Sequence, residues 1–161
     1  MPKFSDYQQL HQIFGMLRWG ILKWPRVGDF GWPSGLCDLM TTNKQFVHVK
    51  HRKGGSAGLS HLFAQGRVSA EILLGDKEFR KATRKVLRRV EPCLQDAVPL
   101  DNFKSDGVEV VFLILGEDSS TLKANLPFFS KVNLSNAFEN ITQRGFHVTI
   151  AGVDKEPKPD A

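Results

Sequence analysis

The sequence predicts an α/β fold: a mixed central sheet flanked by helices. A nearly continuous apolar run at 108–116 is typical of a strand buried on both faces. Alternating apolar residues at 46–50 and 146–153 indicate two further strands. Segments with apolar residues at helical spacing lie between these strands, at 59–74, 76–90 and 127–142. Strands that alternate with helices in this way favour a mixed sheet in an α/β domain.

The chain of 161 residues fits one domain, which we expect to span 1–153 and to end in a charged, flexible tail at 154–161. A hydrophobic content of 41% can support a core, which argues against disorder. No apolar run approaches the roughly 20 residues that cross a bilayer, so we expect no membrane partner. Two cysteines do not make a disulfide framework, which favours a cytoplasmic protein.

The first 50 residues predict a helix and then a hairpin. Apolar residues recur at helical spacing over Phe4–Ile21, and a turn-rich segment of prolines and glycines follows. The short apolar segment Leu36–Met40 is expected to be a strand. Thr41–Lys44 is then a hairpin turn, and Phe46–Lys50 is the returning strand.

A basic, glycine-rich loop is predicted after that strand. It contains Lys50, Arg52 and Lys53 and continues through Gly54–Gly58 to a helix, which Ser60 is expected to cap. Free backbone N–H groups and the helix dipole favour a phosphate at such a helix start. The loop therefore predicts an anion site.

The helix predicted at 76–90 begins after a Gly75–Asp76 stop and cap signal and carries seven basic residues. We expect Phe79, Ala82, Val86 and Val90 to face inward. The outer face then holds Lys77, Arg80, Lys81, Arg84, Lys85, Arg88 and Arg89. This face predicts phosphate contacts, with Arg80 and Arg84 as the chosen residues, although a solvated surface would show the same pattern.

The last third of the chain predicts a connector, a strand, a helix and a final strand. A polar connector at 93–106 leads to the buried strand, and a loop follows at 118–126. Pro127 is well placed to open a helix, and Gly145 is placed to end it.

Charge is distributed unevenly along the chain. Residues 1–91 contain 16 Lys/Arg and 7 Asp/Glu, a net charge of +9, whereas residues 92–161 contain 6 and 10, a net charge of −4. Such polarity suggests one face directed at a polyanion such as DNA or RNA. A solubilising surface is the alternative reading.

Two long passages resemble a sporadically distributed bacterial family of unknown function. They read FVHVKHRKGGSAGLSHLFAQGRVSAE at 46–71 and LPFFSKVNL at 126–134. The members of this family are much longer than this chain, which is similar only to their C-terminal part. The resemblance therefore implies an additional N-terminal domain in longer relatives.

The order of the predicted elements also resembles the restriction-endonuclease-like core. That resemblance implies a nuclease acting on DNA, with Asp38 as a ligand of Mg²⁺ or Mn²⁺ and Lys50 beside the scissile phosphate. Gln65 matches a glutamine that recurs on the following helix. His48 departs from the pattern, since it stands where a second acidic residue belongs and is a poorer ligand for Mg²⁺. Asp29 or Glu71 could supply the missing acid.

Two non-catalytic functions remain open from the sequence. A nucleic-acid-binding module needs only phosphate contacts from the basic loop and the basic helix, which would be salt-sensitive and largely independent of base sequence. A protein-interaction domain would use the apolar segment at 126–134 as a homo-oligomer contact.

Overall fold

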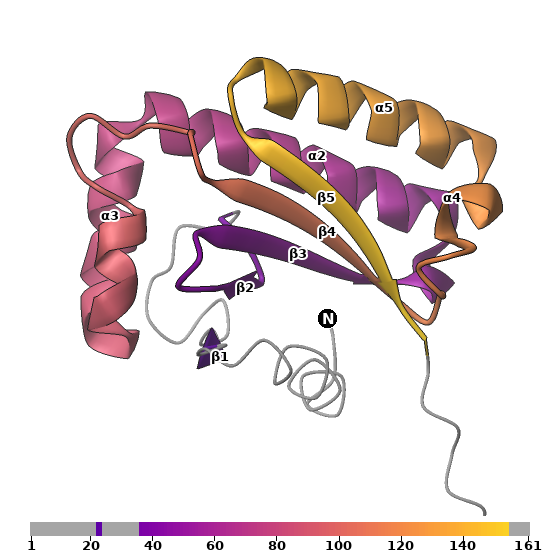
Figure 1. Ribbon diagram of the computed structural model, residues 1–161, viewed down its shortest axis with the longest axis horizontal. Coiled ribbons are helices and arrows are strands. Elements are labelled where there is room, and N and C mark those ends of the chain that lie inside the picture. Colours follow the sequence, from indigo (N-terminus) through magenta and orange to yellow (C-terminus); the bar gives the residue numbers. More distant parts are fainter. Residues whose placement is uncertain (1–21, 24–35, 155–161) are drawn as a thin grey trace, which may run out of the picture.

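The computed structural model describes residues 22–23 and 36–154, which form a mixed sheet with two long helices side by side on one face (Figure 1). The strands are β1 (Leu22–Lys23), β2 (Leu39–Met40), β3 (Gln45–His51), β4 (Glu109–Leu115) and β5 (His147–Val153). The helices are η1 (Arg52–Gly54), α2 (Gly55–Gly75), α3 (Lys77–Val90), η2 (Pro92–Ala97), α4 (Leu122–Asn125) and α5 (Phe128–Gln143). The predicted helix at 4–21 lies outside the described residues.

The strands are ordered β1-β2-β3-β4-β5, and the sheet is mixed as predicted. The first three strands are antiparallel, and β3, β4 and β5 are parallel to one another. Parallel strands need a crossover connection. Here α2 and α3 occupy the crossover from β3 to β4, and α5 occupies the crossover from β4 to β5.

The β2–β3 hairpin is confirmed, although β2 is shorter than predicted. Lys44 has φ of 59° in the turn, and its N–H donates to Thr41 O at 3.1 Å. Of the segment Leu36–Met40, only the last two residues are in β2. Leu36 instead accepts a hydrogen bond from the Ser69 hydroxyl through its carbonyl, which turns this segment toward α2.

The glycine-rich loop is the main error in the predicted elements, since α2 begins at Gly55 rather than Leu59. The cause is packing against α5. Ser56 Oγ lies 3.2 Å from Ser130 Oγ, and Asn133 Nδ2 donates to Ser60 Oγ at 2.7 Å. Ser60 itself donates to Ser56 O at 2.8 Å, so it lies within the helix and does not cap it.

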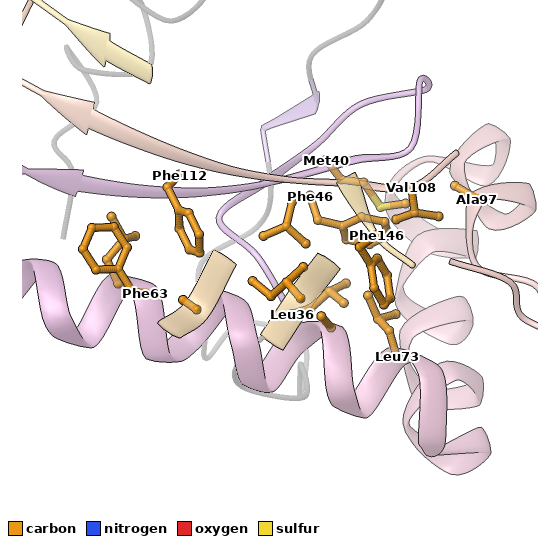
Figure 2. Close-up of a cluster of buried hydrophobic side chains, with 14 of the residues drawn as sticks. Leu36, Met40, Phe46, Phe63, Leu73, Ala97, Val108, Phe112 and Phe146 are labelled. Atoms are coloured by element: carbon orange, nitrogen blue, oxygen red, sulfur yellow. The ribbon is translucent and has the colours of Figure 1, made fainter. Parts of the chain in front are cut away.

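The core lies between α2 and the sheet (Figure 2). Phe46, Phe63 and Phe112 are fully buried there, and the rings of Phe63 and Phe112 meet edge to face with centroids 5.2 Å apart. Gly66 is buried directly above Phe112, where a side chain would have no room. Gly66 therefore allows a close contact between α2 and β4.

The start of α3 and the end of α5 follow their predicted signals. Asp76 caps α3 by accepting a hydrogen bond from Phe79 N at 2.9 Å. Pro127 precedes the first residue of α5, and Gly145 follows the helix with φ of +84°. The connector after α3 differs from the prediction, because it begins with the 3-10 helix η2.

A second apolar cluster occupies the opposite face of the sheet, and its members come from β2 to β5. It contains Leu39, Val47, Val49, Val111, Leu113, Leu115 and Val153. Because β4 contributes to both clusters, its side chains are buried on both faces, as its apolar run predicted.

Candidate nucleic-acid interface

Asp38 lies just before β2, and its carboxylate bonds to the backbone of β3. Asp38 N donates to Val47 O at 2.9 Å, and Asp38 Oδ2 accepts from Val49 N at 2.7 Å. Burial raises the pKa of this carboxyl group, while the bond from Val49 N–H and the charge of Lys50 act in the opposite direction. The Asp38 carboxylate therefore bonds to β3 beyond the end of its backbone pairing with β2.

His48 lies in the middle of β3, on the face that α2 covers. Its side chain is 2% exposed, and its ring lies 6.1 Å from the ring of Phe112, centroid to centroid. Nε2 has no hydrogen-bond partner among the described residues. Burial lowers the pKa of His48 to about 4, so the imidazole is neutral at pH 7.

The structure describes only part of the predicted Mg²⁺ or Mn²⁺ site. Mg²⁺ takes six oxygen ligands, several of them waters, and proteins usually hold it by one or two carboxylates. In the part of the chain that the structure describes, no three His, Cys, Asp or Glu side chains come together. The alternative acid Glu71 lies 3.5 Å from Arg144 Nη2, and Asp29 falls outside the described residues. Gln65 is half-buried on α2, and its side chain makes no hydrogen bond to another described residue.

The buried imidazole predicts a pH-dependent stability. An unfolded histidine titrates near 6.5 and the native His48 near 4, so the unfolded state binds the extra proton between these values. Stability therefore falls on acidification through this window. Between pH 7 and pH 5 we expect a loss of about 2 kcal/mol that His48→Leu abolishes, measured by urea unfolding at each pH.

His61→Leu is the matched control, since His61 is exposed on α2. An equal pH dependence in wild type and His48→Leu would show that the buried imidazole does not titrate as expected.

One of the three cations of the predicted anion site after β3, Arg52, is engaged in contacts within the protein. Arg52 Nε pairs with Glu117 Oε2 at 3.0 Å, and Arg52 Nη2 donates to Asn125 O at 2.8 Å. Lys50 is half-buried beside Gly58. Lys53 is exposed and forms no ion pair with a described residue. Lys53 is therefore the one exposed cation of the predicted set at this end of the described part of the molecule.

Two of the predicted phosphate contacts on α3 point into the protein. Arg80 is 7% exposed, and Nη1 donates to Leu73 O at 2.8 Å and to Leu74 O at 3.1 Å. Arg84 Nη1 donates to Gln95 O at 2.6 Å and to Val98 O at 2.9 Å. These guanidinium groups fasten α3 to the end of α2 and to the η2 segment.

The exposed side of α3 carries the other five basic residues. We call this surface the basic face: Lys77, Lys81, Lys85, Arg88 and Arg89. Lys77 Nζ lies 2.6 Å from Asp101 Oδ1, and Lys81 Nζ lies 3.5 Å from Glu78 Oε2. The other three form no ion pair with any residue that the structure describes.

The basic face and the basic loop lie at opposite ends of α2 (Figure 1). That helix contains 21 residues, which span about 31 Å at 1.5 Å per residue. The two regions that the sequence predicted as one phosphate-binding surface are therefore separate. The seven basic residues that the sequence placed on the outer face of α3 include the five exposed ones, but the two chosen as phosphate contacts are turned inward.

Among the described residues, no helix is both long and apolar enough to cross a membrane.

Comparison with known proteins places the chain in a family. No curated protein and no solved structure matches the chain. A family of unknown function (DUF6119) matches residues 35–154, which is most of the chain. The protein therefore belongs to the DUF6119 family.

Proposed function

We propose that this protein binds the phosphate backbone of DNA or RNA through the basic face of α3. The observation that carries the proposal is the group of three exposed, unpaired cations, Lys85, Arg88 and Arg89, near the end of one helix. The basic face spans Lys77 to Arg89, about 18 Å along the helix axis. A nucleic-acid strand presents several phosphates over that length.

Side-chain chemistry favours backbone contact over base recognition. Lysine and arginine reach phosphate oxygens without regard to base sequence, and base readout needs groups that enter a groove in fixed register. The basic face holds flexible cations, two of which already share their charge with Asp101 and Glu78. The proposal rests on phosphate contacts alone and contains no cleavage step.

The direct test is a salt titration of binding to a random duplex, followed by fluorescence anisotropy. Each neutralised phosphate contributes a slope of about −0.9 to log K against log salt. Three to five contacts predict a slope of about −3 to −4, or a loss on the order of 100-fold between about 50 and 200 mM salt. Single-stranded RNA and DNA of equal length then show which nucleic acid is preferred.

A charge-matched pair of variants locates the surface. The triple variant Lys85→Glu, Arg88→Glu, Arg89→Glu should weaken binding at least on the order of tenfold and flatten the salt slope. The control reverses three exposed lysines on other surfaces, Lys44→Glu, Lys53→Glu and Lys104→Glu. Both variants change the net charge equally, so equal losses would show a general charge effect and would refute a site on α3. No binding by wild type at 50 mM salt would refute the function.

A further inference from the structure

The strand β5 is the last strand of the described sheet, and its register shows which backbone groups are open. His147 N donates to Val108 O at 2.9 Å, and Gly116 N donates to Val153 O at 2.7 Å. Alternate residues of β5 thus bond to β4, and the residues between them direct N–H and C=O away from the sheet. Val148, Ile150 and Gly152 form this outward set.

The outward set is closed at one end. Gly152 N donates to Ser119 Oγ at 2.7 Å, and Ser119 Oγ lies 2.8 Å from Gly152 O. The backbone groups of Val148 and Ile150 bond to no described residue. Natural sheets protect an open edge with charged residues or proline, and the segment Val148–Ile150 contains neither.

An apolar groove of about 590 Å³ runs beside this open edge. Leu126, Leu134 and Phe138 line it from the helical side, and Val148 and Ile150 line it from β5. Phe138 is 49% exposed. An apolar groove beside unpaired backbone groups is suited to a protein partner that adds a strand and covers the side chains.

The exposed side of α5 is complementary to itself about Ser135, which lines the same groove as Thr149. Lys131 and Glu139 are exposed and lie four residues to either side of Ser135. Val132 and Phe138 lie three residues to either side and are 42% and 49% exposed. Two antiparallel copies of α5 that cross at Ser135 therefore place lysine opposite glutamate and valine opposite phenylalanine.

The two-fold axis that relates these two copies of α5 also allows the open edges of their β5 strands to pair. An axis through Thr149 sets Val148 opposite Ile150 of a second copy, in antiparallel orientation. Such a pair exchanges both N–H···O bonds, and the symmetry repeats them on the other side of the axis. The edge of β5 and the exposed side of α5 are each complementary to themselves, so both favour a second copy of this chain as the partner.

We propose that two copies of this chain form a two-fold dimer through β5 and α5, which joins their sheets into one. The second copy covers the groove, and Lys131 of each chain meets Glu139 of the other. This inference is independent of nucleic-acid binding, since α3 lies at one end of the fold and the contact is centred on the middle of β5 and α5 (Figure 1). The dimer carries one basic face on each half.

The test measures the mass of the full chain in solution by sedimentation velocity, for wild type and for charge variants. Wild type should have the mass of two chains. Lys131→Glu should shift the protein to monomer, because it sets two carboxylates opposite each other at each end of the contact. Lys131→Glu combined with Glu139→Lys restores opposite charges and should restore the dimer. Lys85→Glu is the matched control, since Lys85 is exposed on α3 and does not line the groove.

Phe138→Glu should also give a monomer with an unchanged circular dichroism spectrum, because the ring is half exposed. A monomeric wild type at about 100 µM, a concentration at which a standard interface would be formed, would overturn the proposal. So would a dimer that Phe138→Glu or Lys131→Glu leaves intact, or a double charge variant that remains monomeric.

Discussion

Replacing Arg80 with alanine should destabilise the protein by about 3 kcal/mol. The guanidinium donates to the carbonyls of Leu73 and Leu74, which lie in the last turn of α2, and Nε donates to Leu100 O at 3.2 Å. Its carbon Cζ lies 5.8 Å from the centroid of the Phe103 ring. Alanine would leave three buried or half-buried carbonyls without this donor, and the cation would no longer offset the dipole at the helix end.

Urea unfolding of Arg80→Ala and Arg88→Ala measures this effect. Arg88 is exposed on the same helix and has no described partner, so its loss should change stability by no more than about 0.5 kcal/mol. Arg80→Lys keeps the charge without the planar fork and should fall between wild type and alanine. Equal stability in the two alanine variants would show that Arg80 does not hold α3 to α2.

Replacing Gly66 with alanine should cost about 3 kcal/mol, although alanine favours helices more than glycine does. A Cβ at this position would lie 2.4 Å from Phe112 Cε1 and 3.3 Å from Val110 Cγ1. Phe112 is fully buried and packs edge to face on Phe63, so its ring has little freedom to move away. The added methyl group must push α2 away from β4.

Gly58→Ala is the matched control within α2, because a Cβ there meets only the flexible Lys50 side chain, at 3.6 Å. It should be neutral or slightly stabilising in thermal unfolding. The double variant Gly66→Ala, Phe112→Leu should recover part of the loss relative to the sum of the single variants. Strict additivity of Gly66→Ala and Phe112→Leu would place the strain elsewhere.

The sequence predicts the strands better than the surfaces they carry. The alternating and continuous apolar patterns of β3, β4 and β5 give their positions to within one residue, because side-chain burial follows directly from strand period. The start of α2 could not be read in this way. Glycines 54, 55 and 58 resemble a loop locally, and the hydrogen bonds that stabilise the helix there come from α5, more than 70 residues away.

The buried face of α3 shows why a pattern of charged residues does not identify the exposed face of a helix. The prediction placed Ala82 inside and every basic residue outside, yet Ala82 is exposed and Arg80, Thr83 and Leu87 are buried. Arg80, Thr83 and Leu87 recur at helical spacing and so lie on one face of α3. The large apolar Leu87 was the signal in the sequence that this face is buried. That a guanidinium would join them depends on free carbonyls at the end of α2, and only the tertiary structure shows those.

For the candidate nuclease residues too, the sequence predicts their position on the strand but not their environment. Strand alternation correctly places His48 and Lys50 on one face of β3. It does not show that α2 seals this face, nor that the carboxylate of Asp38 bonds to Val49 N at 2.7 Å. Burial and a backbone partner therefore set the environment of these side chains, and neither follows from their order in the chain.

The parallel pairing of β3 with β4 also has a consequence for synthesis on the ribosome. Gln45 lies beside Glu109, so a chain growing from its N-terminus makes β3 long before the strand that covers its edge. During that interval α2 and α3 can form from local contacts, but the apolar edge of β3 stays unpaired. Completion of β4 is then the step that ends the exposure, and a pause in translation between residues 52 and 108 would prolong the time in which the nascent chain is open to aggregation.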